Sequence, residues 1–227
     1  MHRYSIIEKG LSREFLLLQG KGCKWKKCTF CDYHADTSED PYAINREILS
    51  MVSGKYGVLD IINSGSCFEL DEKTISLIQE VVRKKGIHTL WFEAHWMYRS
   101  RLKEFASLFP QACVKFRVGV ESFNGALRNK WNKGIGESVS AEEIASYFNG
   151  CCLLVGLKGE TREDIKRDIE LAEKYFEYYS VNLFCPNSTA EELDEELALF
   201  VKKEIAPALL KSEKAEVLIE NTDLGVG

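Results

Sequence analysis

Residues 15–33 of the chain have the sequence FLLLQGKGCKWKKCTFCDY. The apolar run at residues 15–19 predicts a buried strand, and Cys23, Cys28 and Cys31 follow it with gaps of four and two residues. Thiolates bind soft metals, and [4Fe–4S] clusters are held by cysteine. Three cysteines on one short loop would hold three irons of such a cluster and leave the fourth iron open to another ligand.

Two other interpretations of this loop stay open. A structural zinc ion usually takes four protein ligands. His34 would be the fourth here, although Cys31-Asp32-Tyr33-His34 is a tight stretch for a closed tetrahedral site. The second alternative is a set of buried thiols without a metal. Phe30, directly before the third cysteine, is suited to shielding a cluster from water.

Outward from this loop, short apolar segments alternate with longer segments of helical period. The expected strands cover residues 15–19, 58–62, 89–92, 114–120, 151–155, 179–184 and 217–220. The expected helices cover residues 44–52, 71–84, 99–108, 141–148, 161–178 and 191–211, and Thr161 and Asp164 are placed as in a capping box. Six β-then-α units predict an α/β fold in a single domain, residues 1–227, built as a partial (β/α)6 TIM-like barrel. A flat doubly wound sheet is the alternative, and in both folds ligands gather at the carboxyl ends of the strands.

Composition narrows the class of protein further. The chain has 227 residues, 45% of them hydrophobic, which suits one globular domain with a substantial core. A net charge of −5 argues against a broad nucleic-acid surface. No apolar run is long enough to span a membrane, and residues 1–13 lack the apolar core of a signal peptide, so we expect a cytoplasmic protein. Thiols stay reduced there, and we expect the cysteines in apolar runs to be packed, namely Cys67, Cys113, Cys151 and Cys152.

The cysteine loop resembles the signature of the radical S-adenosylmethionine (SAM) superfamily, which has C-x3-C-x2-C with an aromatic residue before the last cysteine. This chain has C-x4-C-x2-C, with the C-x-aromatic-C half intact as Cys28-Thr29-Phe30-Cys31. The resemblance implies a [4Fe–4S] cluster on Cys23, Cys28 and Cys31, with SAM as the second cofactor. It also implies one-electron cleavage of SAM to a 5′-deoxyadenosyl radical, with the electron supplied by a donor such as flavodoxin or ferredoxin.

The resemblance also points to SAM-binding residues at other strand ends. Asn63-Ser64-Gly65-Ser66 stands where the superfamily often has Gly-Gly-Glu, with Glu69 a weaker candidate for the same contact, and an ordinary turn is the alternative. Glu121 is expected at the ribose, unless it pairs with Arg117 or Arg128. The cofactor-binding residues expected on this basis are Asn63, Ser64, Gly65, Ser66, Glu121, Arg128 and Gly156.

Polar residues at the remaining strand ends are candidates for the substrate. Glu93, His95 and Arg99 follow the strand at 89–92, and Lys133 lies in the loop after the strand at 114–120. The C-terminal segment 220–227 is rich in donors and acceptors, and we expect it to form a short tail that caps the substrate. The substrate-binding residues expected are Glu93, His95, Arg99, Lys133, Asn187, Asn221 and Asp223.

Within the superfamily, the short barrel, Asn-Ser-Gly-Ser, the Trp-Phe-Glu-Ala-His segment and the Glu-Asn-Thr-Asp tail are similar to the queuine lyase branch. That resemblance implies a lyase of queuosine salvage that releases queuine from queuosine 5′-phosphate. The alternatives are another radical SAM enzyme acting on a 7-deazapurine or nucleoside, an activase that installs a glycyl radical on a partner protein, and a non-catalytic zinc-binding module.

Overall fold

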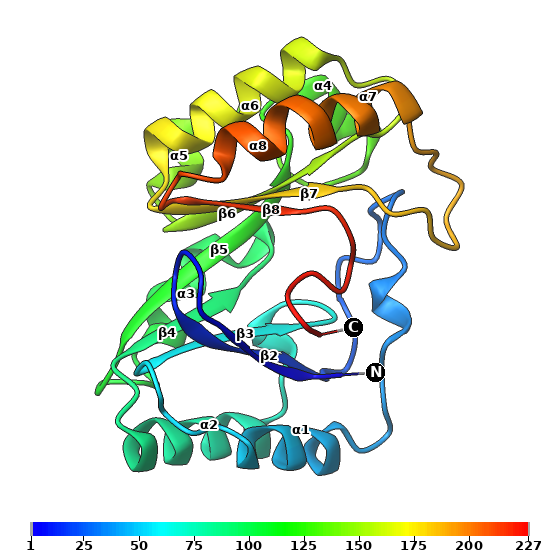
Figure 1. Cartoon of the computed structure of the whole chain (residues 1–227). Helices are drawn as coiled ribbons and strands as arrows, with labels where there is room; N and C mark the ends of the chain where they lie inside the picture. Colours follow the sequence, from blue (N-terminus) through cyan, green and yellow to red (C-terminus); the bar gives the residue numbers. More distant parts are fainter. Residues whose placement is uncertain (1, 227) are drawn as a thin grey trace. The chain divides into compact units, whose positions relative to one another are not determined.

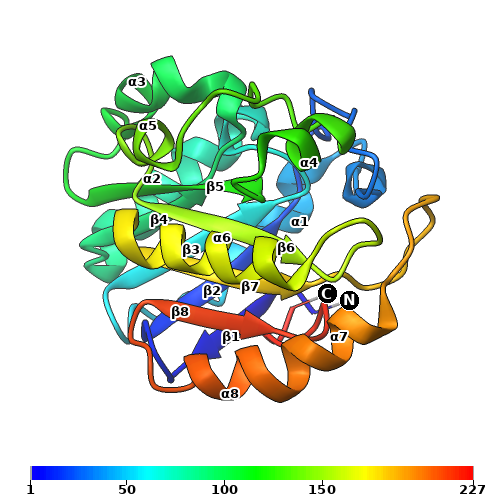
Figure 2. The same ribbon diagram turned by 90° about the horizontal axis from the view of Figure 1, so that it is seen from above.

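The computed structural model describes residues 2–226, and Met1 and Gly227, the last residue of the expected tail, lie outside the described residues. Eight strands form one sheet in the order β1 to β8 (Figures 1 and 2). The strands are β1 Tyr4–Ile7, β2 Arg13–Leu18, β3 Val58–Asn63, β4 Thr89–Glu93, β5 Cys113–Glu121, β6 Gly150–Val155, β7 Tyr178–Leu183 and β8 Ala215–Leu218. The α-helices are α1 Pro41–Ser50, α2 Glu72–Lys85, α3 Leu102–Ala106, α4 Gly125–Lys130, α5 Ala141–Ala145, α6 Arg162–Tyr175, α7 Glu195–Phe200 and α8 Ala206–Leu209.

The strand order decides between the two folds expected from the sequence. A doubly wound sheet reverses its strand order at a switch point, whereas a (β/α) barrel keeps chain order. Strand β1 pairs antiparallel with β2, and the recorded pairs β2–β3, β3–β4, β5–β6, β6–β7 and β7–β8 are parallel. Strands in chain order that alternate with helices form the partial (β/α)6 TIM-like barrel.

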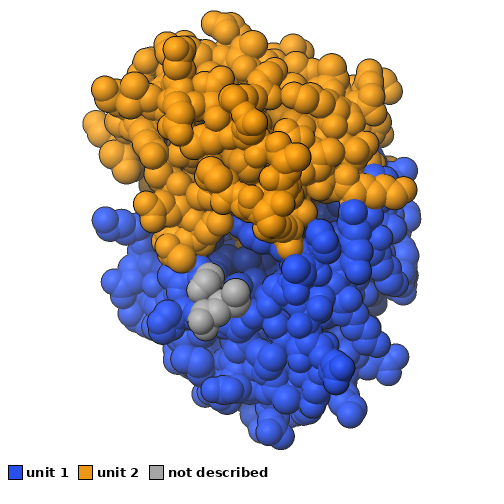
Figure 3. Space-filling model, turned by 90° about the vertical axis from the view of Figure 1, so that its right-hand side faces the viewer, with its two compact units in different colours: residues 1–26, 33–116, 224–227 blue, residues 27–32, 117–223 orange. Residues whose placement is uncertain are grey.

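Two compact units make up the chain, and Figure 3 colours them separately. Unit 1 comprises residues 1–26, 33–116 and 224–227, and unit 2 comprises residues 27–32 and 117–223. Two compact units can belong to one domain, so the single domain expected for residues 1–227 stays a prediction. The cysteine loop contributes residues to both units: Cys23 belongs to unit 1, and Cys28 and Cys31 belong to unit 2.

Unit 1 packs α1 and α2 on one face of β2 to β4 (Figure 1). Helix α2 begins after Asp71, whose carboxylate accepts from Thr74 N at 2.9 Å, and it ends at Gly86, which adopts the left-handed conformation that glycine tolerates. Phe92 on β4 lies within 5.5 Å of the rings of Phe105 and Phe109, measured between ring centroids. This aromatic core fixes the helical segment after β4 against the sheet.

Unit 2 places α6, α7 and α8 over β6, β7 and β8 (Figure 1). The predicted capping box is present: Thr161 accepts from Asp164 N, and the Asp164 carboxylate accepts from Thr161 N, both at 3.1 Å. Leu153, Val155 and Val181 are fully buried on β6 and β7. Unit 2 therefore has its own hydrophobic core. It supports the strand ends at Glu121 and Gly156, two of the predicted site residues.

Several elements differ from the sequence-based expectation. Strand β1 and helix α4 were not predicted, and the helix expected at 99–108 is a 3-10 segment, Trp96–Arg101, followed by α3. The helix expected at 191–211 begins only at Glu195, and a π-helical turn, Val201–Ile205, separates α7 from α8. Cys113, expected to be packed, is exposed because it opens β5. Within residues 2–226, no helix is long and apolar enough to cross a membrane.

Candidate active site

Unit 1 holds the first part of the cysteine loop against the end of β3. Lys24 N, directly after Cys23, donates to Glu69 Oε1 at 3.0 Å. Gly65 lies so close that a Cβ atom built on it would stand 3.1 Å from Cys23 Cα and 2.1 Å from Glu69 Oε2. A side chain at residue 65 would displace both neighbours, so the predicted Asn-Ser-Gly-Ser segment needs glycine at this position.

Trp25, in the first gap of the cysteine motif, stacks on the ring of His95 just after β4. The ring centroids are 5.0 Å apart with an interplanar angle of 22°. His95 N donates to Ser66 Oγ at 2.9 Å, and His95 Nδ1 accepts from Met97 N at 3.2 Å. The next loop residue, Lys26, has a φ of 49°. The longer gap of this chain therefore contains an aromatic anchor and a left-handed residue.

Unit 2 holds the second part of the loop through the segment after β7. Asn187 Nδ2 donates to Phe30 O at 2.8 Å, and the Asp32 carboxylate accepts from Ser188 N at 3.0 Å. The ring of Phe30 makes an edge contact with Trp131, with centroids 6.3 Å apart. The structure therefore ties Asn187, predicted to bind substrate, to the backbone between Cys28 and Cys31.

The three loop cysteines have the chemistry that a [4Fe–4S] cluster requires. Each is partly exposed and none forms a disulfide, whereas burial raises the pKa of Cys67 and of Cys151 well above the usual range. Buried thiols of that kind stay protonated and make poor ligands. Among the described residues, no three His, Cys, Asp or Glu side chains gather as they would around one metal ion. A cluster places each cysteine on its own iron, so its ligands need not surround a single ion.

The end of β3 is organised by Asp36, a residue that the sequence analysis did not single out. Ser64 Oγ donates to Asp36 Oδ2 at 2.8 Å, Gln19 Nε2 donates to Oδ1 at 2.7 Å, and Arg3 pairs with both carboxylate oxygens. Burial opposes the charge, but the bonds from Arg3, Gln19 and Ser64 lower the pKa of Asp36. Asp36 therefore stays ionised and orients Ser64.

The end of β5 pairs two of the predicted site residues. Lys133 Nζ lies 2.7 Å from Glu121 Oε1, and the same ammonium lies 5.9 Å from the centroid of the Phe30 ring. Glu121 has a φ of 66°, and a Cβ on Gly119 would come within 2.5 Å of its carboxylate. Lys133 is thus an ion-pair partner of Glu121 that the sequence did not indicate, in addition to the Arg117 and Arg128 expected there.

Arg128 is fully buried, and burial lowers the pKa of its guanidinium. Its Nη2 donates to the carbonyls of Gly136, Glu137 and Val139 at 2.8 to 3.2 Å. These bonds hold the loop that follows Lys133. A cofactor contact by Arg128 stays a prediction, and the contacts seen are structural.

Gly156 ends β6 in a turn closed by a buried carboxyl group. Gly156 has a φ of 90°, and its N–H donates to Glu160 Oε2 at 2.7 Å. Burial, together with the nearby charges of Asp168 and Asp164, raises the pKa of Glu160 to about 8. At neutral pH Glu160 is therefore mostly protonated, and the turn that carries Gly156 is fixed by a neutral side chain.

The remaining predicted substrate residues occupy varied surroundings. Arg99 is exposed, with its guanidinium 4.6 Å from the Trp96 ring centroid, and Glu93 is half-buried at the end of β4. Asn221 is exposed, and Asp223 Oδ2 accepts from Ile219 N at 2.6 Å and Glu220 N at 2.9 Å. Asp223 thus closes the turn that begins the tail.

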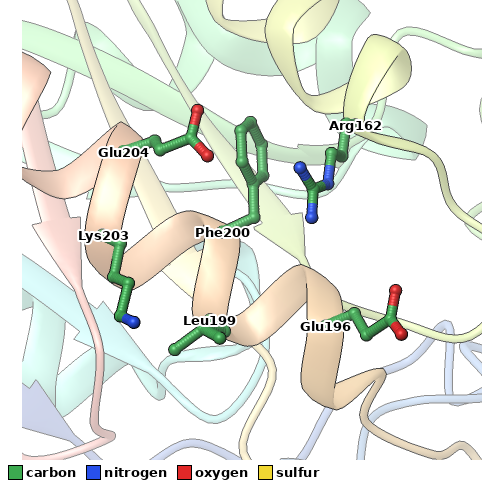
Figure 4. Close-up of a pocket in the computed structure, with 6 residues that line it drawn as sticks. All are labelled: Arg162, Glu196, Leu199, Phe200, Lys203 and Glu204. Atoms are coloured by element: carbon green, nitrogen blue, oxygen red, sulfur yellow. The ribbon is translucent and has the colours of Figure 1, made fainter.

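The pocket of about 330 Å³ in Figure 4 is lined by residues of α6, α7 and the π-helical turn after α7. Its lining residues are Arg162, Glu196, Leu199, Phe200, Lys203 and Glu204. None of them is among the predicted site residues.

A three-cysteine loop directly after the first parallel strand of a partial barrel defines the class of radical SAM enzymes. No protein-family model matches the chain, and no curated protein sequence matches it. Among solved structures, the chain is similar to the queuine lyase from Clostridium spiroforme bound to SAM and queuine. The two are 39% identical, the match covers 100% of this chain and 99% of the other, and the TM-score is 0.95. The chain belongs to the queuine lyase family, and the expected fold class is confirmed.

Proposed function

We propose that this protein is a radical SAM lyase that cleaves queuosine 5′-phosphate and releases queuine. The observation that carries the proposal is the full-length match, at 39% identity, to a queuine lyase bound to SAM and queuine. The cysteine loop supports it independently, because its three thiols are partly exposed and form no disulfide.

Cys23, Cys28 and Cys31 would hold a [4Fe–4S] cluster, and Asn63, Ser64, Gly65, Ser66, Glu121 and Gly156 are the residues proposed for SAM. When bound, these cofactors supply the 5′-deoxyadenosyl radical that takes a hydrogen atom from the ribose of the substrate. Within this chain, Asp36 holds Ser64, Lys133 neutralises Glu121, and Glu160 fixes the turn at Gly156. The protein's contribution is orientation of the reactants and exclusion of water.

Arg99 is the residue proposed for the substrate phosphate. The resemblance to the queuine lyase branch makes Arg99, Arg128 and Lys133 candidates for this phosphate. Arg128 is buried on backbone carbonyls and Lys133 is paired with Glu121. Arg99 is exposed, with its guanidinium over the Trp96 ring and Nη1 donating to Trp96 O at 3.4 Å, and it makes no ion pair with a carboxylate of residues 2–226, so its charge suits a phosphate. Asp223 or Glu93 is proposed for the base, and Asn221 for a further contact from the tail.

The electron is proposed to come from a small redox protein such as flavodoxin or ferredoxin. The cytoplasm is the proposed location, because reduced thiols and an oxygen-sensitive cluster suit that compartment. A 7-deazapurine-modifying radical enzyme with the same cofactors is the second candidate. The same strand-end residues and the same cysteine loop would serve either reaction.

The test begins with protein purified without oxygen and reconstituted with iron and sulfide. It is incubated with dithionite, SAM and queuosine 5′-phosphate, and the products are measured by mass spectrometry beside a Cys28→Ala control. Queuine and 5′-deoxyadenosine together, both absent from the control, are expected. Deoxyadenosine without queuine would retain the radical chemistry and reject the substrate, and neither product from iron-loaded protein would reject the enzyme.

A further inference from the structure

Glu69 contacts the cysteine loop on both sides of Cys23. Its backbone carbonyl accepts from Lys21 N at 3.3 Å, and its side-chain Oε1 accepts from Lys24 N at 3.0 Å. The two amides belong to residues that bracket the first cysteine of the motif. One residue of the segment after β3 therefore sets the path of the chain through Cys23.

Further bonds fix the Glu69 carboxylate itself. Oε2 accepts from Ser66 N at 2.7 Å, and Oε1 also accepts from the Tyr98 hydroxyl at 3.0 Å. Burial and the charge of Glu69 raise the pKa of Tyr98, so the phenol remains a donor. Only 5% of Glu69 is exposed, and three donors from three segments of unit 1 converge on it. Charge-assisted bonds of this kind hold their partners in a defined geometry.

Gly65 adds a steric element to the same arrangement. With no side chain, it allows the Cys23 backbone to approach the end of β3, where a Cβ would stand 3.1 Å from Cys23 Cα and 3.2 Å from Cys23 N. The approach of Cys23 and the bonds of Glu69 to Lys21 N and Lys24 N act on the same short stretch of the loop, residues 21 to 24. The loop is thus held before any cofactor binds.

We propose that Glu69 is a positioning residue that fixes the cluster loop around Cys23, and that it is not the residue that receives the amino group of SAM. The inference rests on the proposed function, since it concerns a cluster on Cys23. It follows from the donors on the carboxylate, which are two backbone amides and a tyrosine of the protein. The protein's own donors therefore take three of the roughly four acceptor positions of the carboxylate.

Cluster retention without SAM tests this inference. Reconstituted wild type, Glu69→Gln and Asp71→Ala are incubated with an iron chelator in the absence of SAM, and bleaching of the cluster absorbance is followed. Asp71→Ala is the matched control, because it removes the cap of α2 two residues away and costs fold stability without touching the loop. The reduced proteins are also compared by EPR before and after addition of SAM, and folding is checked by circular dichroism.

We expect Glu69→Gln to lose its cluster about tenfold faster than wild type, the size typical for losing a group that orients a metal ligand. Its EPR signal should change before SAM is added, and Asp71→Ala should behave as wild type. Wild-type retention in Glu69→Gln with a weaker affinity for SAM would overturn the inference, because Glu69 would then act on the cofactor. If Glu69→Gln does not fold, Glu69→Asp is judged by the same criteria. Asp keeps the charge, but its side chain is too short to accept from Lys24 N and Ser66 N together. Wild-type protein that binds no iron would instead reject the proposed function.

Discussion

Lys133 and Glu121 form an ion pair at the end of β5, with Nζ 2.7 Å from Oε1 and each side chain only 10% exposed. Glu121 reaches this position with a left-handed backbone, and Gly119 leaves room for both charged groups. The pair is twelve residues apart in the chain, yet it joins a residue proposed for SAM to one first expected at the substrate. We therefore propose that Lys133 acts on the cofactor side, by holding the Glu121 carboxylate in place.

Replacing Lys133 by Met should destabilise the protein by about 3 kcal/mol, the usual cost of leaving one partner of a buried pair without its counter-charge. Urea unfolding of the apoprotein measures this loss. The double variant Lys133→Met, Glu121→Gln should recover more than half of it, because the unpaired carboxylate is then gone. A single variant as stable as wild type would show that the pair contributes nothing to the fold.

Asn187→Ala should weaken cluster retention and leave the KM for the nucleotide unchanged. Asn187 Nδ2 donates to Phe30 O, so its loss removes a bond worth about 1 kcal/mol from the loop between Cys28 and Cys31. Iron release to a chelator and steady-state kinetics separate the two roles. Asn149→Ala is the control. Asn149 bonds Glu177 just before β6 begins, whereas Asn187 follows the carboxyl end of β7. A raised KM with normal iron release would return Asn187 to the substrate.

The sequence carries a signal for those parts of the fold that depend on local periodicity. The capping box at Thr161 and Asp164, the strand at Val58 and the helix after Asp71 are local patterns, and the structure contains all three. Strand β1 was missed because it is a short edge strand whose pattern is only half-buried. Helix α4 was missed because it is short and begins with glycine.

The candidate site was less predictable because its organising bonds join residues distant in the chain. Asp36 and Ser64 are 28 residues apart, and Asn187 and Phe30 are 157 residues apart. Sequence position marked Ser64 and Asn187 as strand-end residues but gave no signal for their partners. The one available clue to Asp36 was its place shortly after the cysteine motif, in a loop certain to lie near the site.

Asp223→Asn tests the tail proposed to cover the substrate. Asn keeps one acceptor oxygen for Ile219 N and Glu220 N, so the unfolding free energy should change by less than about 0.5 kcal/mol. If the carboxylate binds the base, the KM should rise about tenfold, the size of one charge-assisted hydrogen bond, with kcat within about twofold. Asp194→Asn, which alters the cap of α7, is the control. Unchanged KM in Asp223→Asn would limit Asp223 to closing the turn.

Glu160→Gln should change how stability depends on pH. The unfolded chain releases the Glu160 proton near its ordinary pKa of 4.5, whereas burial keeps that proton on the folded chain up to about pH 8. The folded state therefore binds more protons between these values, and the stability contributed by neutral Glu160 is lost as pH rises, at no more than about 1.4 kcal/mol per pH unit. Gln imitates the neutral carboxyl group at every pH and still accepts from Gly156 N.

The two proteins should consequently be similar in stability near pH 5, and wild type should become progressively the less stable of the two towards about pH 8. Asp168, whose pKa burial raises to about 6, produces a slope of the same sign in both proteins, so the difference between them reports Glu160 together with its coupling to the Asp168 charge. Urea unfolding across this range measures the difference. Parallel stability curves would show that Glu160 is ionised in the folded protein, and the turn at Gly156 would then be held by a carboxylate whose charge is stabilised within the fold.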